Sequence, residues 1–364
     1  MKKILCLIDT IEFGGGAERQ MTGLASFLGE KGYCVDLVSY HVHKNTYIDK
    51  SESSSCRIIL LQVKNNKWSK LTSVKRFIQM SGGYDCMITY KDGPNIIGCL
   101  LKLIGINLKV IVSERSSNKN INIKEKIKFF LYRFADYIVP NSYTQNNFIM
   151  QRFPNLTGKL ITITNFTDVL HYSPVETAVN NKIIIMTAAR IVPEKNILNY
   201  IDAIKILKEN GFAEKVHFDW FGNVQLGMEK YKDICIEKCK NLDIEDMFEF
   251  HNGTKDIIKY YQTCDIFCLP SVVEGYPNVI CEAMSCGKPI ICGRVCDNPF
   301  IVQENKNGLL FDPTDVNSIY LVLKQIIEMS HSKRIELGEK SRVIAESLFA
   351  KDVFVQKYVD LIEN

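Results

Sequence analysis

The chain contains two series of short apolar runs, and a helical pattern follows most of these runs. This alternation limits the folds that the chain can adopt. The runs are KKILCLI, CVDLVSY, RIILLQV, CMITY, KVIVSE and DYIVP, then KIIIMTAA, VHFDWF, MFEFH, CDIFCLP, KPIIC and GLLF. They are apolar on both faces, as the strands of a parallel sheet covered by helices must be. The sequence therefore predicts an α/β fold of the doubly wound kind.

The two series meet in the stretch LITITNFTDVLHYSP, residues 160–174, where a strand, a polar turn and Pro174 interrupt the rhythm. We interpret this stretch as a hinge, which predicts two doubly wound domains, residues 1–165 and 166–364. From Ser332 onward the pattern predicts two helices, broken around Phe349 to Asp352.

Composition excludes several classes of protein. With 364 residues, 46% hydrophobic and 24% charged, the chain is long enough for two ordinary globular domains. The apolar start ILCLI is too short for a secretory signal, so we expect the thirteen cysteines to lie in a reducing cytosol. No apolar run reaches the roughly 18 residues that a membrane span needs.

Charge is unevenly distributed. Residues 1–165 contain 23 Lys+Arg and 12 Asp+Glu, a net +11, which leaves 22 against 29, a net −7, for the remainder. A basic half can meet anionic lipid or phosphorylated ligands, or can simply be solvated surface. No zinc-finger spacing, ribonucleoprotein signature or recognition helix accompanies it, so we expect no nucleic-acid partner.

The loops that follow parallel strands should contain the ligand site. The first of them holds Gly14, Gly15 and Gly16 before an amphipathic helix, which suits a close approach of the backbone to an anion, although a tight turn would also use glycines. The spacing is not that of the dinucleotide fingerprint GxGxxG, and no acidic residue ends the second strand. His41 and His43 follow that strand, and without a third ligand nearby we interpret them as loop residues.

Two later loops contain charged candidates. Arg190 and Lys195 precede a helix and could neutralise a diphosphate, with ordinary surface charge as the alternative. The stretch SVVEGYPNVICEAMSCGKPII, residues 271–291, places Glu274 in a loop and Glu282 on the following helix, with Pro277 suited to its first turn. A carboxylate there can accept hydrogen bonds from ribose hydroxyls.

The sequence resembles the retaining glycosyltransferases of family four over nearly its whole length. The motifs are GGGAERQ, ADYIVPNS at 135–142, the hinge NFTD, ARIVPEKN and above all the block 271–291, a Glu, seven residues, Glu pattern with EAM and GKP. The resemblance implies the GT-B fold, two Rossmann-like domains facing across a cleft. In that arrangement the last helix is a candidate to pack back on the first domain.

The resemblance also implies the roles of the candidate residues. Glu282 would bind the ribose of a nucleotide-sugar donor, which we expect to be a UDP-sugar. Arg190 and Lys195 would stabilise the departing diphosphate. The candidates to act in catalysis are Glu274, Arg190, Lys195, Glu114 and Arg115. The candidates to bind substrate are Gly15, Gly16, Asn165, Gly222, Gly275, Tyr276, Pro277, Asn278, Val279 and Glu282.

Some positions depart from the family pattern. Ser113, Glu114 and Arg115 stand where many relatives have a histidine, and Gly222-Asn223-Val224 replaces the usual Gly-Asp-Gly. No Asp-any-Asp motif occurs, which fits a hexosyltransferase that needs no metal and no cofactor. The cysteines at 235, 239, 264 and 268 lack a CxxC knuckle, and we interpret them as core residues rather than zinc ligands.

The acceptor is expected to be a glycan or a polyprenyl-diphosphate-linked sugar in surface polysaccharide synthesis, such as capsule or lipopolysaccharide. There are two apolar-basic segments, NIIGCLLKLIGINLK and INIKEKIKFFLYRF. They could lie on the anionic inner face of the cytoplasmic membrane, or they could be core helices. The alternatives to a transferase are a nucleotide-sugar epimerase on the same fold and a non-catalytic nucleotide-sugar-binding protein.

Overall fold

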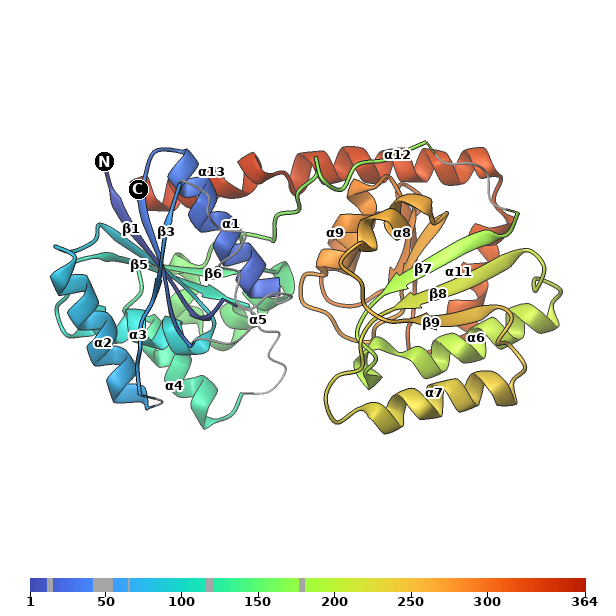
Figure 1. The fold of residues 1–364 in the computed structure, drawn as a ribbon, viewed down its shortest axis with the longest axis horizontal. Coiled ribbons are helices and arrows are strands. Elements are labelled where there is room, and N and C mark those ends of the chain that lie inside the picture. Colours follow the sequence, from blue (N-terminus) through green and yellow to red (C-terminus); the bar gives the residue numbers. More distant parts are fainter. Residues whose placement is uncertain (12–15, 42–54, 65, 116–120, 177–180) are drawn as a thin grey trace. The chain divides into compact units, whose positions relative to one another are not determined.

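The computed structural model describes residues 1–11, 16–41, 55–64, 66–115, 121–176 and 181–364. They divide into two compact units, residues 1–166 with 351–364, and residues 167–350. Each unit contains a six-stranded sheet with helices on both faces (Figure 1). All the strand pairs are parallel, so the predicted doubly wound architecture is confirmed.

The sheet of the first unit has the strand order β3-β2-β1-β4-β5-β6. Its strands are β1 (Lys3–Thr10), β2 (Cys34–His41), β3 (Arg57–Leu60), β4 (Cys86–Tyr90), β5 (Lys109–Glu114) and β6 (Tyr137–Pro140). Its helices are α1 (Gly16–Glu30), α2 (Lys67–Met80), α3 (Asp92–Leu103), α4 (Ile123–Tyr132), α5 (Tyr143–Arg152), the short η2 (Pro154–Lys159) and α13 (Lys351–Glu363). The order reverses between β1 and β4, which is where ligands bind in such sheets.

The apolar pattern of β1 explains this layering. Leu5 and Leu7 belong to the core shared with α2, α3, α4 and α5, whereas Ile4 and Cys6 belong to the core shared with α1 and α13. Successive side chains of a strand point to opposite faces, so a central strand needs apolar residues at every position. Figure 1 shows α2, α3 and α4 on one face of this sheet and α1 with α13 on the other.

The sheet of the second unit has the strand order β12-β11-β10-β7-β8-β9. Its strands are β7 (Ile183–Ala188), β8 (Val216–Phe221), β9 (Phe248–His251), β10 (Ile266–Leu269), β11 (Ile290–Gly293) and β12 (Gly308–Phe311). Its helices are η3 (Pro193–Lys195), α6 (Ile197–Glu209), α7 (Glu229–Asn241), α8 (Ile257–Thr263), α9 (Asn278–Ser285), α10 (Asn298–Ile301), α11 (Val316–Glu328) and α12 (His331–Leu348). The order reverses between β7 and β10.

The two faces of this sheet have separate cores. Residues of α6, α7 and α11 pack with Phe218 and Trp220, and residues of α8, α9 and α12 pack with Phe221 and Phe267. Every strand predicted from the two series of apolar runs is present, and most of those runs meet the requirement that central parallel strands impose.

The predicted break between the last two helices is confirmed, because α12 ends at Leu348 and α13 begins at Lys351. Helix α13 belongs to the first unit, where it packs on α1. The rings of Phe354 and Phe166 lie 5.0 Å apart, and Tyr33 donates a hydrogen bond of 2.7 Å to Glu363. Of the helices that the structure describes, none is long and apolar enough to cross a membrane.

Candidate functional site

The reversal of strand order in the second unit brings two candidate segments to the same edge of the sheet. Arg190 and Lys195 follow β7, and the segment from Ser271 to Glu282 follows β10. Because β7 and β10 are neighbours, the segments after them emerge side by side at the carboxyl edge. This is the position at which doubly wound sheets bind ligands.

Hydrogen bonds from Asn196 and Val272 hold these segments together. Asn196 adopts the left-handed backbone conformation with φ 61°, which Asn tolerates better than most residues. Its side-chain amide donates to the carbonyls of Pro270 at 3.1 Å and Pro313 at 2.6 Å. The backbone N–H of Val272 donates to Glu194 O at 3.0 Å. The loop after β7 is therefore fixed against the loops after β10 and β12.

Lys195 and Glu274 form an ion pair at this edge. Their side chains are only 16% and 11% exposed, so water screens the pair less than it would screen a surface pair. Arg190 is directed elsewhere, because its Nη1 donates to Gln225 Oε1 at 2.5 Å in an exposed contact. The structure thus brings the predicted residues Lys195 and Glu274 together and leaves Arg190 outside that pair.

Glu282 is buried on α9 and accepts a hydrogen bond of 3.0 Å from the hydroxyl of Tyr261. Tyr261 lies on α8 and is fully buried, so it fixes the carboxylate with little freedom. Tyr261 could not be identified from the sequence, because Tyr261 and Glu282 lie 21 positions apart on different helices. Helix α9 begins at Asn278, so the prediction that Pro277 occupies the first turn is wrong and Pro277 is the N-cap residue.

Other candidates in this unit have packing roles as well. The ring of Tyr276 is buried and meets Phe349 edge-on at 6.2 Å between centroids. A Cβ atom at Gly222 would lie 1.8 Å from Ala189 O, so only glycine fits where the ends of β7 and β8 approach. Gly275, Asn278 and Val279 are half-buried around the start of α9. These positions remain substrate-binding predictions.

Two buried hydroxyls lie at the carboxyl edges of the sheets. In the described part of the chain, Thr10 Oγ1 at the end of β1 and Ser271 Oγ after β10 have no hydrogen-bond partner. A buried hydroxyl without a partner costs about 1–3 kcal/mol. A ligand that supplied a partner at either position would recover that cost.

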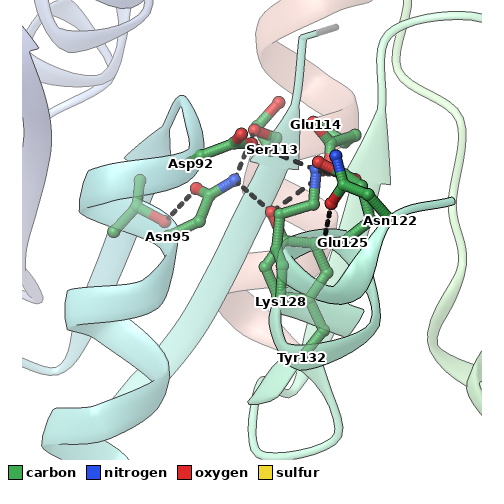
Figure 2. A network of polar contacts seen from close by, with 9 residues as sticks. Asp92, Asn95, Ser113, Glu114, Asn122, Glu125, Lys128 and Tyr132 are labelled. Carbon is green, nitrogen blue, oxygen red and sulfur yellow. Dashed lines mark hydrogen bonds and ion pairs between the residues drawn. The ribbon is translucent and has the colours of Figure 1, made fainter. Parts of the chain in front are cut away.

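In the first unit, Glu114 is fully buried at the end of β5 within a polar network (Figure 2). Glu114 Oε2 accepts from the hydroxyl of Tyr132 at 3.2 Å and from the ammonium of Lys128 at 2.9 Å. Lys128 also pairs with Glu125 at 2.9 Å and Asp92 at 3.2 Å. Burial would lower the pKa of Lys128, but these carboxylates outweigh it and raise that pKa.

Asn95 connects this network to the sheet. Its Nδ2 donates to Ser113 O at 2.9 Å and to Tyr132 Oη at 2.8 Å, and its Oδ1 accepts from Thr89 at 2.6 Å (Figure 2). Glu114 is therefore held from α3, α4 and β5. The sequence analysis identified Glu114 as a candidate but missed Lys128, which lies 14 residues further along the chain on a different element.

Lysines and phenylalanines are not separated into an exposed and a buried set on α4. Lys128 and Phe129 are both buried, while Ile123, Ile127 and Phe130 are exposed. Lys128 is buried because three carboxylates neutralise it, and such pairing is what permits a buried charge. The other apolar-basic segment forms α3, whose buried residues include Ile97, Cys99 and Leu101, so it contributes to the core.

Arg115 is held by several partners within the first unit. Its guanidinium lies 3.8 Å from the centre of the Tyr90 ring and donates to Asn165 Oδ1 at 2.6 Å. It also donates to Ser113 Oγ at 2.9 Å and to the hydroxyl of Tyr358 on α13 at 3.2 Å. These bonds link β5, the hinge residue Asn165 and α13, and the role of Arg115 in catalysis stays a prediction.

Lys91 is a candidate that the sequence did not reveal. It directly follows β4, beside the strand reversal, with φ 73° and ψ 160°, a region that is normally occupied by glycine. Its ammonium pairs with Asp9 at 3.0 Å and with the buried Glu18 of α1. Strained backbone of this kind is concentrated at ligand sites.

The glycine-rich loop is only partly visible. Gly15 lies outside the described residues, and Gly16 is the exposed first residue of α1. Within the following motif, Gln20 exchanges two hydrogen bonds with the backbone of Phe166, at 2.8 and 2.9 Å, which ties α1 to the hinge. His41 contacts Lys70 at 2.9 Å, and His43 lies outside the described residues.

The four cysteines considered for zinc are all buried. Cys235 and Cys239 lie on α7, and Cys268 lies on β10 with Cys264 just before it. Burial raises the pKa of each thiol, to about 11 for Cys235 and about 12 for the other three. Protonated buried thiols behave as small core residues.

Known proteins are similar to this chain in sequence and in fold. The protein-family model of glycosyl transferases group 1 matches residues 171–343. An uncharacterised glycosyltransferase of Haemophilus influenzae is 26% identical over 352 residues, 95% of this chain and 96% of that protein. A Campylobacter jejuni N-acetylgalactosamine-N,N'-diacetylbacillosaminyl-diphospho-undecaprenol 4-alpha-N-acetylgalactosaminyltransferase is 23% identical over 335 residues, 86% and 87% of the two chains.

The crystal structure of Anabaena Alr3699/HepE with UDP and glucose superposes with a TM-score of 0.84 at 19% identity, covering 100% of both chains. Two parallel six-stranded sheets and this likeness together define the GT-B fold. The resemblance drawn from the motifs is confirmed by the match of the glycosyl transferases group 1 model to residues 171–343 and by the likeness in fold. This segment contains the Lys195–Glu274 pair and Glu282.

Proposed function

We propose that this protein is a retaining glycosyltransferase that moves a sugar from a UDP-sugar to a glycan or polyprenyl-diphosphate-linked acceptor. The observation that carries the proposal is the half-buried Lys195–Glu274 pair at the carboxyl edge of β7 and β10, within the segment of the group 1 family. A cation and a carboxylate at a strand-order reversal suit a ligand that carries both phosphate and hydroxyl groups.

The donor would bind along the second unit. Glu282, oriented by Tyr261, accepts hydrogen bonds from the ribose hydroxyls, and Lys195 neutralises the diphosphate. Glu274 then leaves its ion pair to orient the donor sugar, while Arg190 adds a second cation. The backbone N–H groups at the start of α9 favour an anion.

Catalysis in this proposal is electrostatic. The nucleoside diphosphate departs with its charge stabilised by Lys195 once Glu274 has moved away, and Arg190 turns from Gln225 to add a second cation. The acceptor hydroxyl attacks from the face that the diphosphate leaves, so the anomeric configuration is retained. The absence of an Asp-any-Asp motif from the sequence supports a transfer without a metal or another cofactor.

The proposed acceptor follows from one of the relatives. The Campylobacter jejuni protein is named for transfer to a sugar on diphospho-undecaprenol, and it aligns with 86% of this chain. We therefore propose that this protein also acts in the assembly of a cell-surface polysaccharide on a lipid carrier. The acceptor would contact the carboxyl edge of the first unit, where Lys91 pairs with Asp9 and Glu18.

A lipid-linked acceptor requires access to a membrane, and α4 offers a surface for it. Ile123, Ile127 and Phe130 are 76%, 55% and 58% exposed, and the exposed cations Lys126 and Arg133 flank them. An apolar helix face bordered by cations matches an anionic lipid surface. We therefore propose that the protein is cytoplasmic and peripheral on the inner face of the cytoplasmic membrane.

Thermal unfolding with UDP, GDP, ADP and UDP-sugars, with and without EDTA, tests the donor. Stabilisation by UDP that EDTA leaves unchanged is the expected result. Transfer to a polyprenyl-diphosphate-linked sugar, followed by analysis of the anomeric product, tests the rest. Conversion of the UDP-sugar without an acceptor would indicate an epimerase, and tight UDP binding without either reaction would indicate a binding protein.

A further inference from the structure

Strands β8 and β9 place four metal-binding side chains on one face of the second sheet. Asp219 is paired with Glu249 in the register, and Phe221 with His251. His217, Asp219 and Phe221 alternate with core residues that face α6 and α7, so they lie on the opposite face together with Glu249 and His251. Two imidazoles and two carboxylates are therefore gathered on adjacent strands.

Distances within this cluster suit coordination. The ligand atoms of His217, Asp219 and Glu249 all lie within 4.8 Å of one another. Nε2 of His217 is 3.5 Å from Asp219 Oδ1, close to the ~3.3 Å that separates two ligand atoms on a tetrahedral ion with bonds of about 2.0–2.1 Å. That separation is too long for a strong hydrogen bond and leaves room for an ion.

His251 plays a different part in the cluster. Its Nε2 is 2.6 Å from Asp219 Oδ1, a hydrogen-bond distance, and its ring stacks on Phe221 at 4.4 Å between centroids. An imidazole fixed in this way orients the carboxylate and does not itself bind the metal ion. The outer partners of metal ligands act in the same way. Its Nδ1 lies 3.7 Å from Glu249 Oε1.

We propose that His217, Asp219 and Glu249 bind a divalent transition metal ion, with His251 as the outer partner that orients Asp219. Imidazole nitrogen combined with carboxylate oxygen favours zinc-like ions over magnesium or calcium, which prefer oxygen ligands alone. The side chain of Glu249 is 60% exposed, so an ion reaches the site from solvent and keeps a water ligand.

This site is separate from the proposed transfer reaction. It lies on the edge pair β8–β9, whereas Lys195 and Glu274 follow β7 and β10. The carbonyl of His251 accepts from Gly222 N at 3.0 Å, and Gly253 N donates to Asn223 Oδ1 at 3.0 Å. A bound ion would therefore fix the strand ends from which the loop at 222–224 emerges, a structural role.

Calorimetric titration of the chelator-treated full chain with Zn²⁺, and optical titration with Co²⁺, test this site. We expect one saturable ion per chain. His217→Ala and Glu249→Gln should weaken binding at least ~10-fold, and His251→Ala by about 10–100-fold. His331→Ala, at the exposed start of α12, is the matched control and should bind as the unsubstituted protein does.

Three results would overturn the proposal. They are the lack of saturable binding by the unsubstituted protein, binding that survives both His217→Ala and Glu249→Gln, and a cobalt spectrum with thiolate charge-transfer bands, which would assign the ion to cysteines. Glu249→Gln changes an exposed side chain, so it keeps the test valid if His217→Ala fails to fold. Because binding is measured without donor or acceptor, failure here is distinguishable from failure of the proposed transfer.

Discussion

Lys195 and Glu274 lie 79 residues apart in the chain, and their side chains form an ion pair at the carboxyl edge of the second sheet. Two hydrogen bonds from Asn196 and one from Val272 hold their loops in place. Each residue of the pair is the other's partner when no donor is bound. A donor that binds here must therefore offer an anion to Lys195 and hydroxyls to Glu274.

Lys195→Ala should lower kcat about 10²–10³-fold with little change in the affinity for the donor. The reason is that the charge it stabilises grows on the diphosphate only as the bond breaks. Steady-state kinetics and direct titration, both with the intact UDP-sugar, measure the two effects. Lys230→Ala, on the exposed side of α7, is the control. Equal losses in kcat and in donor affinity would contradict this role.

Glu282→Ala should weaken UDP binding by about 1.5–3 kcal/mol, because hydrogen bonds to a charged group are lost. Tyr261→Phe removes only the hydroxyl that orients Glu282 and should cost about 0.5–1.5 kcal/mol. Calorimetry with UDP measures both, with Tyr172→Phe as a control for the loss of a tyrosine hydroxyl. An unchanged UDP affinity in Glu282→Ala would place the ribose elsewhere.

Lys128→Met should destabilise the first unit by about 3–5 kcal/mol, because Glu114 would be left buried without its cation. Urea unfolding followed by circular dichroism measures the loss. Lys126→Met, two residues away and exposed, should change stability by less than about 0.5 kcal/mol. The double variant Lys128→Met/Glu114→Gln should recover part of the loss, and no recovery would show that the pair itself is not the cause.

Lys91→Gly and Lys91→Ala separate backbone strain from charge. Both remove the ion pairs with Asp9 and Glu18, but only glycine relieves the conformation at φ 73°. Lys91→Gly should therefore be more stable than Lys91→Ala by about 1–3 kcal/mol in urea unfolding. Both should lower kcat/KM for the acceptor to a similar extent. Acceptor kinetics unchanged in both variants would remove Lys91 from the site.

Ile127→Ser/Phe130→Ser should abolish co-sedimentation with vesicles that contain anionic lipid and leave UDP binding unchanged. Both side chains are exposed on α4, so the fold should tolerate the change. Binding by the unsubstituted protein should fall as salt is raised, because screening weakens attraction between exposed charges. Leu226→Ser, at an exposed position of the second unit, is the control. Vesicle binding that does not depend on anionic lipid would contradict the proposal that this face of α4 binds an anionic membrane.

Most of the strands were predictable because central parallel strands need apolar residues on both faces, whereas β8 and β9 are polar on the face that holds His217, Asp219 and Glu249. The block from Ser271 to Ile291 likewise identified Glu274 and Glu282 as candidates without any structure. The sequence left open whether the segment that forms α4 lies on a membrane or in the core. Its residue types did not indicate which of its side chains are buried, because Lys128 is buried beside Phe129 while Phe130 is exposed.

By itself, the sequence determined the doubly wound fold, the break between the last two helices and the strand ends that hold the candidate residues. These depend on local periodicity and on short motifs, which the chain displays directly. Only the tertiary structure decided that Lys195 meets Glu274, that Tyr261 holds Glu282 and that three carboxylates surround Lys128. Apart from Lys128 and Glu125, which lie three residues apart on α4, these partners come from different elements of the fold. The order of strands in a sheet, not the sequence spacing, determines which of those elements become neighbours.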